Sequence, residues 1–120
     1  MKQLMELLFP LESGLMTTVR LTTGGLCSLV GLDLESSEDC KVCLTESLLL
    51  LTHRGFPAAR VTFFEEDGLF IRVAGEGEAR TQANCPEDEI SFALLNALLG
   101  SVSIEKEDGR LLAISFRFQK

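Results

Sequence analysis

Apolar residues recur along the chain at two different spacings, and these spacings separate predicted helices from predicted strands. Three segments carry apolar residues three and four positions apart, which is the spacing of one helical face: residues 11–30, 36–55 and 87–99. Five shorter segments alternate apolar and polar residues or are rich in β-branched and aromatic residues, as strands are: residues 1–9, 60–66, 69–74, 102–105 and 111–118. The predicted element order is therefore β-α-α-β-β-α-β-β.

The second helix has the clearest start and stop signals. Ser36 or Ser37 can cap its N-terminus, and Gly55 is suited to follow its last turn. Its apolar stripe is expected to face the core: Cys40, Cys43, Leu44, Ser47, Leu48 and Leu51.

The third helix is expected to end at Gly100 and to bury four apolar residues: Ile90, Leu94, Leu95 and Leu98.

Two Asp-Gly pairs separate neighbouring strands, and this dipeptide favours a tight hairpin turn. They are Asp67-Gly68 and Asp108-Gly109. Hairpins that alternate with helices predict an α/β (α+β) two-layer sandwich, with a mixed, mostly antiparallel sheet and the helices on one face. Nothing resembles a linker, so residues 1–120 are expected to form a single domain.

Composition narrows the classes of function. The chain has 120 residues, 46% of them hydrophobic, and a formal net charge of -7. This is enough apolar sequence for one folded core. The acidic balance disfavours binding to nucleic acid or to an anionic membrane surface. The sequence has no apolar run of about 20 residues, the length that crosses a bilayer, and no signal-peptide pattern. We therefore expect a cytoplasmic protein.

The four cysteines do not form a recognisable metal motif. Cys40 and Cys43 have the C-x-x-C spacing, but no second pair exists, and His53 is the only histidine. A structural zinc site needs four ligands. We therefore expect buried thiols and no metal.

The chain resembles a known family over nearly its whole length, and its closing segment carries part of that resemblance. Residues 92–99, followed by 102–104 and Gly109, are similar to the last helix and final hairpin of the GHKL (Bergerat-fold) ATPase domain. The resemblance is strongest to the small anti-sigma-factor serine kinases, and the element order agrees. It implies a histidine kinase-like ATPase fold whose relatives bind Mg-ATP and contact sigma factors or anti-anti-sigma (STAS) proteins.

The family's first nucleotide motif falls on residues 46–55. By this resemblance Glu46 stands at the general base and Gly55 at the motif's glycine, while Leu50 replaces the asparagine that holds Mg²⁺ and Arg54 replaces a histidine. A leucine side chain cannot coordinate magnesium, which requires oxygen ligands.

The second and third motifs are also altered. Val73 replaces the aspartate that reads the adenine amino group, although Gly75 and Gly77 are retained. Leaving that amino group unpaired in a buried site would cost roughly 1–3 kcal/mol. Residues 89–91 replace the phosphate-cradling Gly-x-Gly, and Glu87 and Asp88 before them would repel a triphosphate.

These substitutions predict a vestigial nucleotide pocket. We expect a regulatory protein-binding module that needs no cofactor and acts by stoichiometric contact with a sigma factor, a STAS protein or a second copy of itself. Two alternatives stay open. One is an active ATP-binding serine/threonine-protein kinase with altered nucleotide contacts, which would use Glu46 as its base. The other is a phosphotransfer or scaffold module of a two-component system, in which His53 accepts phosphate.

Several residues have simpler interpretations as well. Glu46 can be a surface carboxylate, His53 can complement the end of its helix, and Gly75 and Gly77 can serve a turn. An acidic rim around the pocket is a further hypothesis, and such a rim would steer a basic partner. Its members would be Glu76, Glu78, Glu87, Asp88 and Glu89.

Overall fold

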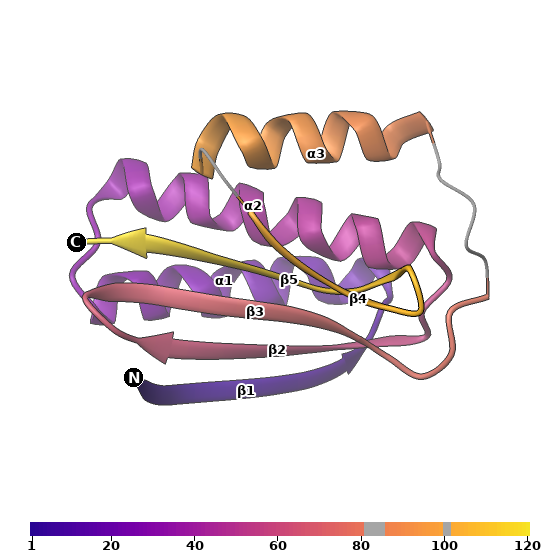
Figure 1. Ribbon diagram of the computed structural model, residues 1–120. Coiled ribbons are helices and arrows are strands. Elements are labelled where there is room, and N and C mark those ends of the chain that lie inside the picture. The colour runs from indigo at the N-terminus through magenta and orange to yellow at the C-terminus, as the bar shows by residue number, and fades with distance from the viewer. Residues whose placement is uncertain (81–85, 100–101) are drawn as a thin grey trace.

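The computed structural model describes residues 1–80, 86–99 and 102–120, which form five strands and three helices in the predicted order (Figure 1). The elements are β1 (Lys2–Pro10), α1 (Ser13–Leu29), α2 (Leu34–His53), β2 (Ala58–Glu65), β3 (Gly68–Glu76), α3 (Pro86–Leu99), β4 (Ser103–Glu107) and β5 (Arg110–Gln119). The order of elements is therefore confirmed. Cys85 and the predicted stop at Gly100 lie outside the described residues.

The five strands form one open sheet in the order β1-β2-β3-β5-β4. Every neighbouring pair is antiparallel, so the expectation of a mixed sheet was wrong. Hairpins join β2 to β3 and β4 to β5, and the aspartate of each Asp-Gly turn has a positive φ: 50° at Asp67 and 53° at Asp108. β4 is the short edge strand, and all five of its side chains are exposed.

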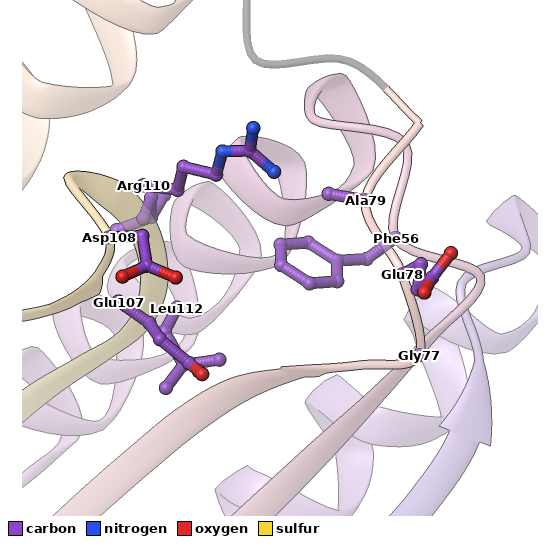
Figure 2. Close-up of a pocket in the computed structure, with 9 residues that line it drawn as sticks. Phe56, Gly77, Glu78, Ala79, Glu107, Asp108, Arg110 and Leu112 are labelled. Atoms are coloured by element: carbon purple, nitrogen blue, oxygen red, sulfur yellow. The ribbon is translucent and has the colours of Figure 1, made fainter.

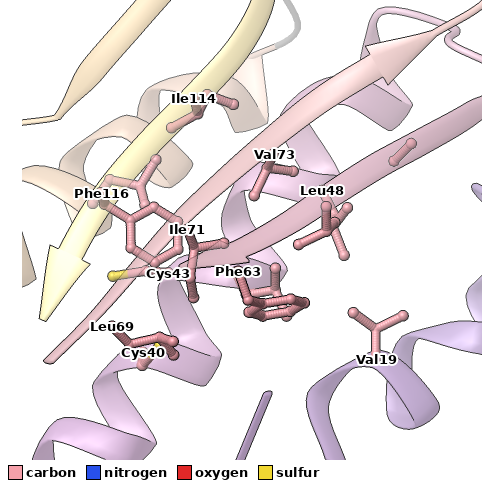
Figure 3. Close-up of a cluster of buried hydrophobic side chains, with 14 of the residues drawn as sticks. Val19, Cys40, Cys43, Leu48, Phe63, Leu69, Ile71, Val73, Ile114 and Phe116 are labelled. Carbon is pink, nitrogen blue, oxygen red and sulfur yellow. The ribbon is translucent and has the colours of Figure 1, made fainter. Parts of the chain in front are cut away.

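One face of the sheet carries the core. Alternate residues on β2, β3 and β5 lie opposite one another in the register, as in the row Val61, Val73 and Ile114. The helices cover this face (Figure 1), and the predicted stripe of α2, from Cys40 to Leu51, is fully buried against it (Figure 3). The two-layer arrangement with helices on one face is therefore confirmed.

The opposite face of the sheet carries ion pairs beside a contact between the rings of Phe64 and Phe70. Arg60 lies within 3.3 Å of Glu6 and within 2.7 Å of Glu76, and Arg72 binds Glu105 at 2.7 Å. Such half-exposed pairs contribute little to stability. These charged side chains suit this face to solvent.

Helix α2 begins one turn earlier than the serines predicted. Asp33 is its N-cap, and a side-chain oxygen of Asp33 accepts a hydrogen bond from the backbone N–H of Ser36 at 2.8 Å. This hydrogen bond holds the pKa of the Asp33 carboxyl below its usual range. Asp and Ser are equally good caps in sequence, so the choice between them depends on where the preceding turn ends. Gly55 follows the helix with φ 79°, as predicted.

Helix α3 buries only part of the face that its apolar spacing predicted. Leu95 is fully buried and Leu98 is partly buried, as expected. Ile90 is 63% exposed and Leu94 is 38% exposed, whereas Asp88, Ser91 and Leu95 are buried. The inward face is amphipathic because it lies against the polar end of α2, where Asp88 and Ser91 find partners. Burial of polar groups is tolerated when they are hydrogen-bonded.

Among the described residues, no helix is both long enough and apolar enough to cross a membrane.

Replacing Leu95 should test the corrected face of α3. Leu95→Ala removes a fully buried side chain and should lower the free energy of unfolding by about 2–5 kcal/mol. Ile90→Ala, a matched truncation on the exposed face, should change it by less than about 0.5 kcal/mol. Urea denaturation followed by circular dichroism measures both. Equal losses in the two variants would show that the helix faces the core as first predicted.

Candidate functional site

The sequence-predicted site residues lie at one end of the sandwich, where α2 ends and β3 leaves the sheet. Leu50 and Val73, two of the predicted pocket residues, have no solvent exposure. Val73 points into the core between sheet and helices (Figure 3). Both side chains therefore contribute to the hydrophobic core.

The three glycines of the predicted pocket are packed against side chains of this chain. A Cβ atom placed on Gly75 would lie 2.6 Å from ring carbons of Phe56, and one on Gly77 would lie 2.6 Å from Cγ of Pro57. At Gly55 a Cβ would meet Cβ of Arg80 at 2.8 Å. Internal packing accounts for the lack of a side chain at Gly75. At Gly55 and Gly77 the positive φ values of 79° and 85° add to it.

Glu46 lies half-buried between α2 and α3. Its Oε2 is 3.4 Å from Oγ of Ser91, which donates a weak hydrogen bond to it. Glu46 therefore joins the two helices across the site. This contact is compatible with a structural carboxylate and does not exclude a base.

Asp88 forms the polar centre of the site. It is 3% exposed, and its Oδ1 lies 2.9 Å from Nδ1 of His53. Its Oδ2 accepts a hydrogen bond from the guanidinium of Arg54, which is 7% exposed. One carboxylate thus binds both residues at the C-terminal end of α2. The hypothesis that Asp88 belongs to an exposed acidic rim was wrong, because the side chain is buried and neutralised by Arg54.

Glu76 does not belong to such a rim either, because it binds Arg60 on the outer face of the sheet.

A cavity of about 370 Å³ opens beside this end of the sheet (Figure 2). Phe56 points into it from the segment after α2, with Gly77, Glu78 and Ala79 beside it, and the β4–β5 hairpin forms the opposite wall. Sequence reasoning did not assign Phe56 any role. The pairing of a ring with Gly75, nineteen residues later, has no local signal in the sequence.

The three described cysteines are buried free thiols, as predicted. Burial, with the nearby carboxylates of Asp39 and Glu46, raises the pKa of the Cys43 thiol to about 12. A hydrogen bond to Cys27, together with burial, raises the pKa of the Cys40 thiol. Within the described ranges, no group of three or more His, Cys, Asp or Glu residues is placed to hold a metal ion.

No protein-family model matches the chain, and no curated protein matches it.

Removing the Asp88 carboxylate should destabilise the fold. Asp88→Ala removes the carboxylate that binds the buried guanidinium of Arg54 and the ring of His53, which should cost about 3–5 kcal/mol of unfolding free energy. Glu89→Ala, which truncates the exposed carboxylate next in sequence, should cost less than about 0.5 kcal/mol. Chemical denaturation compares the two. A small loss in Asp88→Ala would mean that Arg54 reaches solvent or another partner without cost.

The raised pKa of Cys43 predicts a loss of stability in alkali. Unfolding releases the thiol to its ordinary pKa of 9.0, so its contribution is fully present below pH 9 and is lost as pH rises toward 12. The free energy of unfolding should fall by up to about 1.4 kcal/mol per pH unit from this thiol. In Cys43→Ala the slope over this range should be shallower by that amount. Identical slopes in urea denaturation series would contradict this role for Cys43.

Proposed function

We propose that this chain is a regulatory protein-binding module of the anti-sigma-factor type that needs no Mg-ATP. By the resemblance, its partner in the cytoplasm is a sigma factor, an anti-anti-sigma (STAS) protein or a second copy of the chain. It acts by stoichiometric contact, holding the partner without phosphorylating it. The histidine kinase-like (Bergerat) architecture is part of the same proposal.

The packing of Phe56 against Gly75 carries the proposal. By the resemblance, Gly75 and Gly77 belong to a motif of the nucleotide pocket. Here Gly75 lies against an aromatic ring of the chain itself, at 2.6 Å from where a Cβ would be. Leu50 and Val73 add to this, because neither offers an oxygen and both are fully buried.

The exposed face of α3 is suited to contact with a protein partner. On the outward side of α3 the apolar residues Ile90, Ala93, Leu94 and Ala97 are exposed. Their spacing of three and four residues forms an apolar stripe that faces solvent. Such stripes on a helix fit the apolar face of another protein segment. Exposed apolar patches of this kind often mark interaction surfaces.

Isothermal titration with Mg-ATP tests the loss of nucleotide binding. We expect no saturable heat with millimolar nucleotide, because the metal ligand and the adenine acceptor are both missing. Micromolar affinity would overturn the proposal and favour the active-kinase alternative.

Partner capture from the source organism, analysed by mass spectrometry, tests the regulatory role. Recovery of a sigma factor or a STAS protein at one-to-one stoichiometry would support the proposal. A response regulator in its place would favour the two-component alternative, in which His53 takes part. The ring of His53 also contacts Asp88, so circular dichroism must first show that His53→Ala is folded. Loss of phosphate acceptance in the folded variant would favour the two-component alternative.

A further inference from the structure

A second cavity, of about 350 Å³, lies between α3 and the β4–β5 hairpin. Phe92 contributes an aromatic ring from α3, and Ile104 and Leu111 contribute aliphatic side chains from the hairpin. Three cations complete the lining: Arg54, Lys106 and Arg110. The volume falls within the range of small-molecule sites.

The charge of this cavity is opposite to that of the chain. The sequence holds 18 acidic and 11 basic residues, yet among the described residues three cations and no carboxylate line the cavity. Arg54 is neutralised by Asp88. Lys106 and Arg110, in contrast, form no ion pair within the part of the chain that the structure describes.

Two acidic side chains of the β4–β5 hairpin line one cavity, and Lys106 lines the other. Glu107 and Asp108 line the neighbouring cavity beside Phe56, whereas Lys106 lines the cavity under α3. Arg110 borders both cavities, and its side chain extends away from Asp108 (Figure 2). The Asp108-Gly109 turn fixes this arrangement, because both residues have positive φ and hold Lys106 opposite Leu111.

We propose that the cavity between α3 and the hairpin binds a small organic anion, with a phosphate or carboxylate head on an apolar body. A guanidinium offers paired N–H donors that match either head group, and the ammonium of Lys106 adds a point charge. Phe92, Ile104 and Leu111 cover the apolar body. Binding does not require magnesium, because the described lining holds no carboxylate to share such an ion. The inference goes beyond the proposed function and does not depend on it.

An NMR titration in magnesium-free buffer tests this site. Phenyl phosphate and benzoate share a ring and differ in head group, and phenol is the uncharged control. We expect saturable amide shifts at Arg54, Phe92 and residues 104–111 with at least one anion, and none with phenol. The anion with the lower dissociation constant identifies the head group that the cavity prefers.

Variants of the two exposed cations sharpen the test. Lys106→Gln combined with Arg110→Gln should raise the dissociation constant by roughly tenfold or more, because charge-assisted hydrogen bonds are lost. Arg20→Gln, which removes an exposed cation from α1, should leave it unchanged. The unliganded spectra show whether each variant is folded.

Three results would overturn the site. They are the absence of shifts with both anions, equal shifts with phenol, and equal affinity in the double variant and in Arg20→Gln. A failure of the proposed function has a different signature, namely nucleotide binding that depends on magnesium and survives the double variant.

Discussion

The burial of helix α2 is the constraint on which the rest of the structure depends. It contacts α1 on one side and α3 on the other, and it also packs on β3 and β5. Seven of its residues are buried, so its position constrains the two other helices and the sheet on which it packs. Its C-terminal end is fixed separately, by the bonds of Asp88 to His53 and Arg54. Apolar packing thus sets the position of α2 between the layers, and one buried carboxylate sets where α3 begins relative to it.

Features that depend on local chemistry could be predicted from the sequence. The stripe of α2 follows from residue spacing alone, and both hairpins follow from Asp-Gly pairs that accept positive φ. The start of α2 was misplaced because Asp33 and Ser36 are both good caps, and the preceding turn chooses between them. The buried face of α3 was predicted only in part, for a different reason. Its buried polar residues have partners 34, 35 and 45 positions away, which no local pattern can reveal.

In the candidate site, too, some features could be predicted from residue type and others depend on tertiary packing. That Leu50 and Val73 offer no side-chain oxygen could be predicted, because it depends only on residue type. That Phe56 packs on Gly75, and that Asp88 turns inward, could not be predicted, because both depend on how separate segments meet. A glycine in a motif can leave room for a ligand beside the backbone, or it can leave room for a side chain of the same protein. Only the packed structure distinguishes them.

The short strand at the end of the sheet has a consequence for the behaviour of the protein in concentrated solution. An unpaired strand edge is a template on which other chains can add strands and start aggregates. β4 is five residues long, and Glu105, Lys106 and Glu107 occupy three of its positions. Charged side chains on so short an edge oppose further strand addition, so this end of the sheet is protected against fibre-like growth.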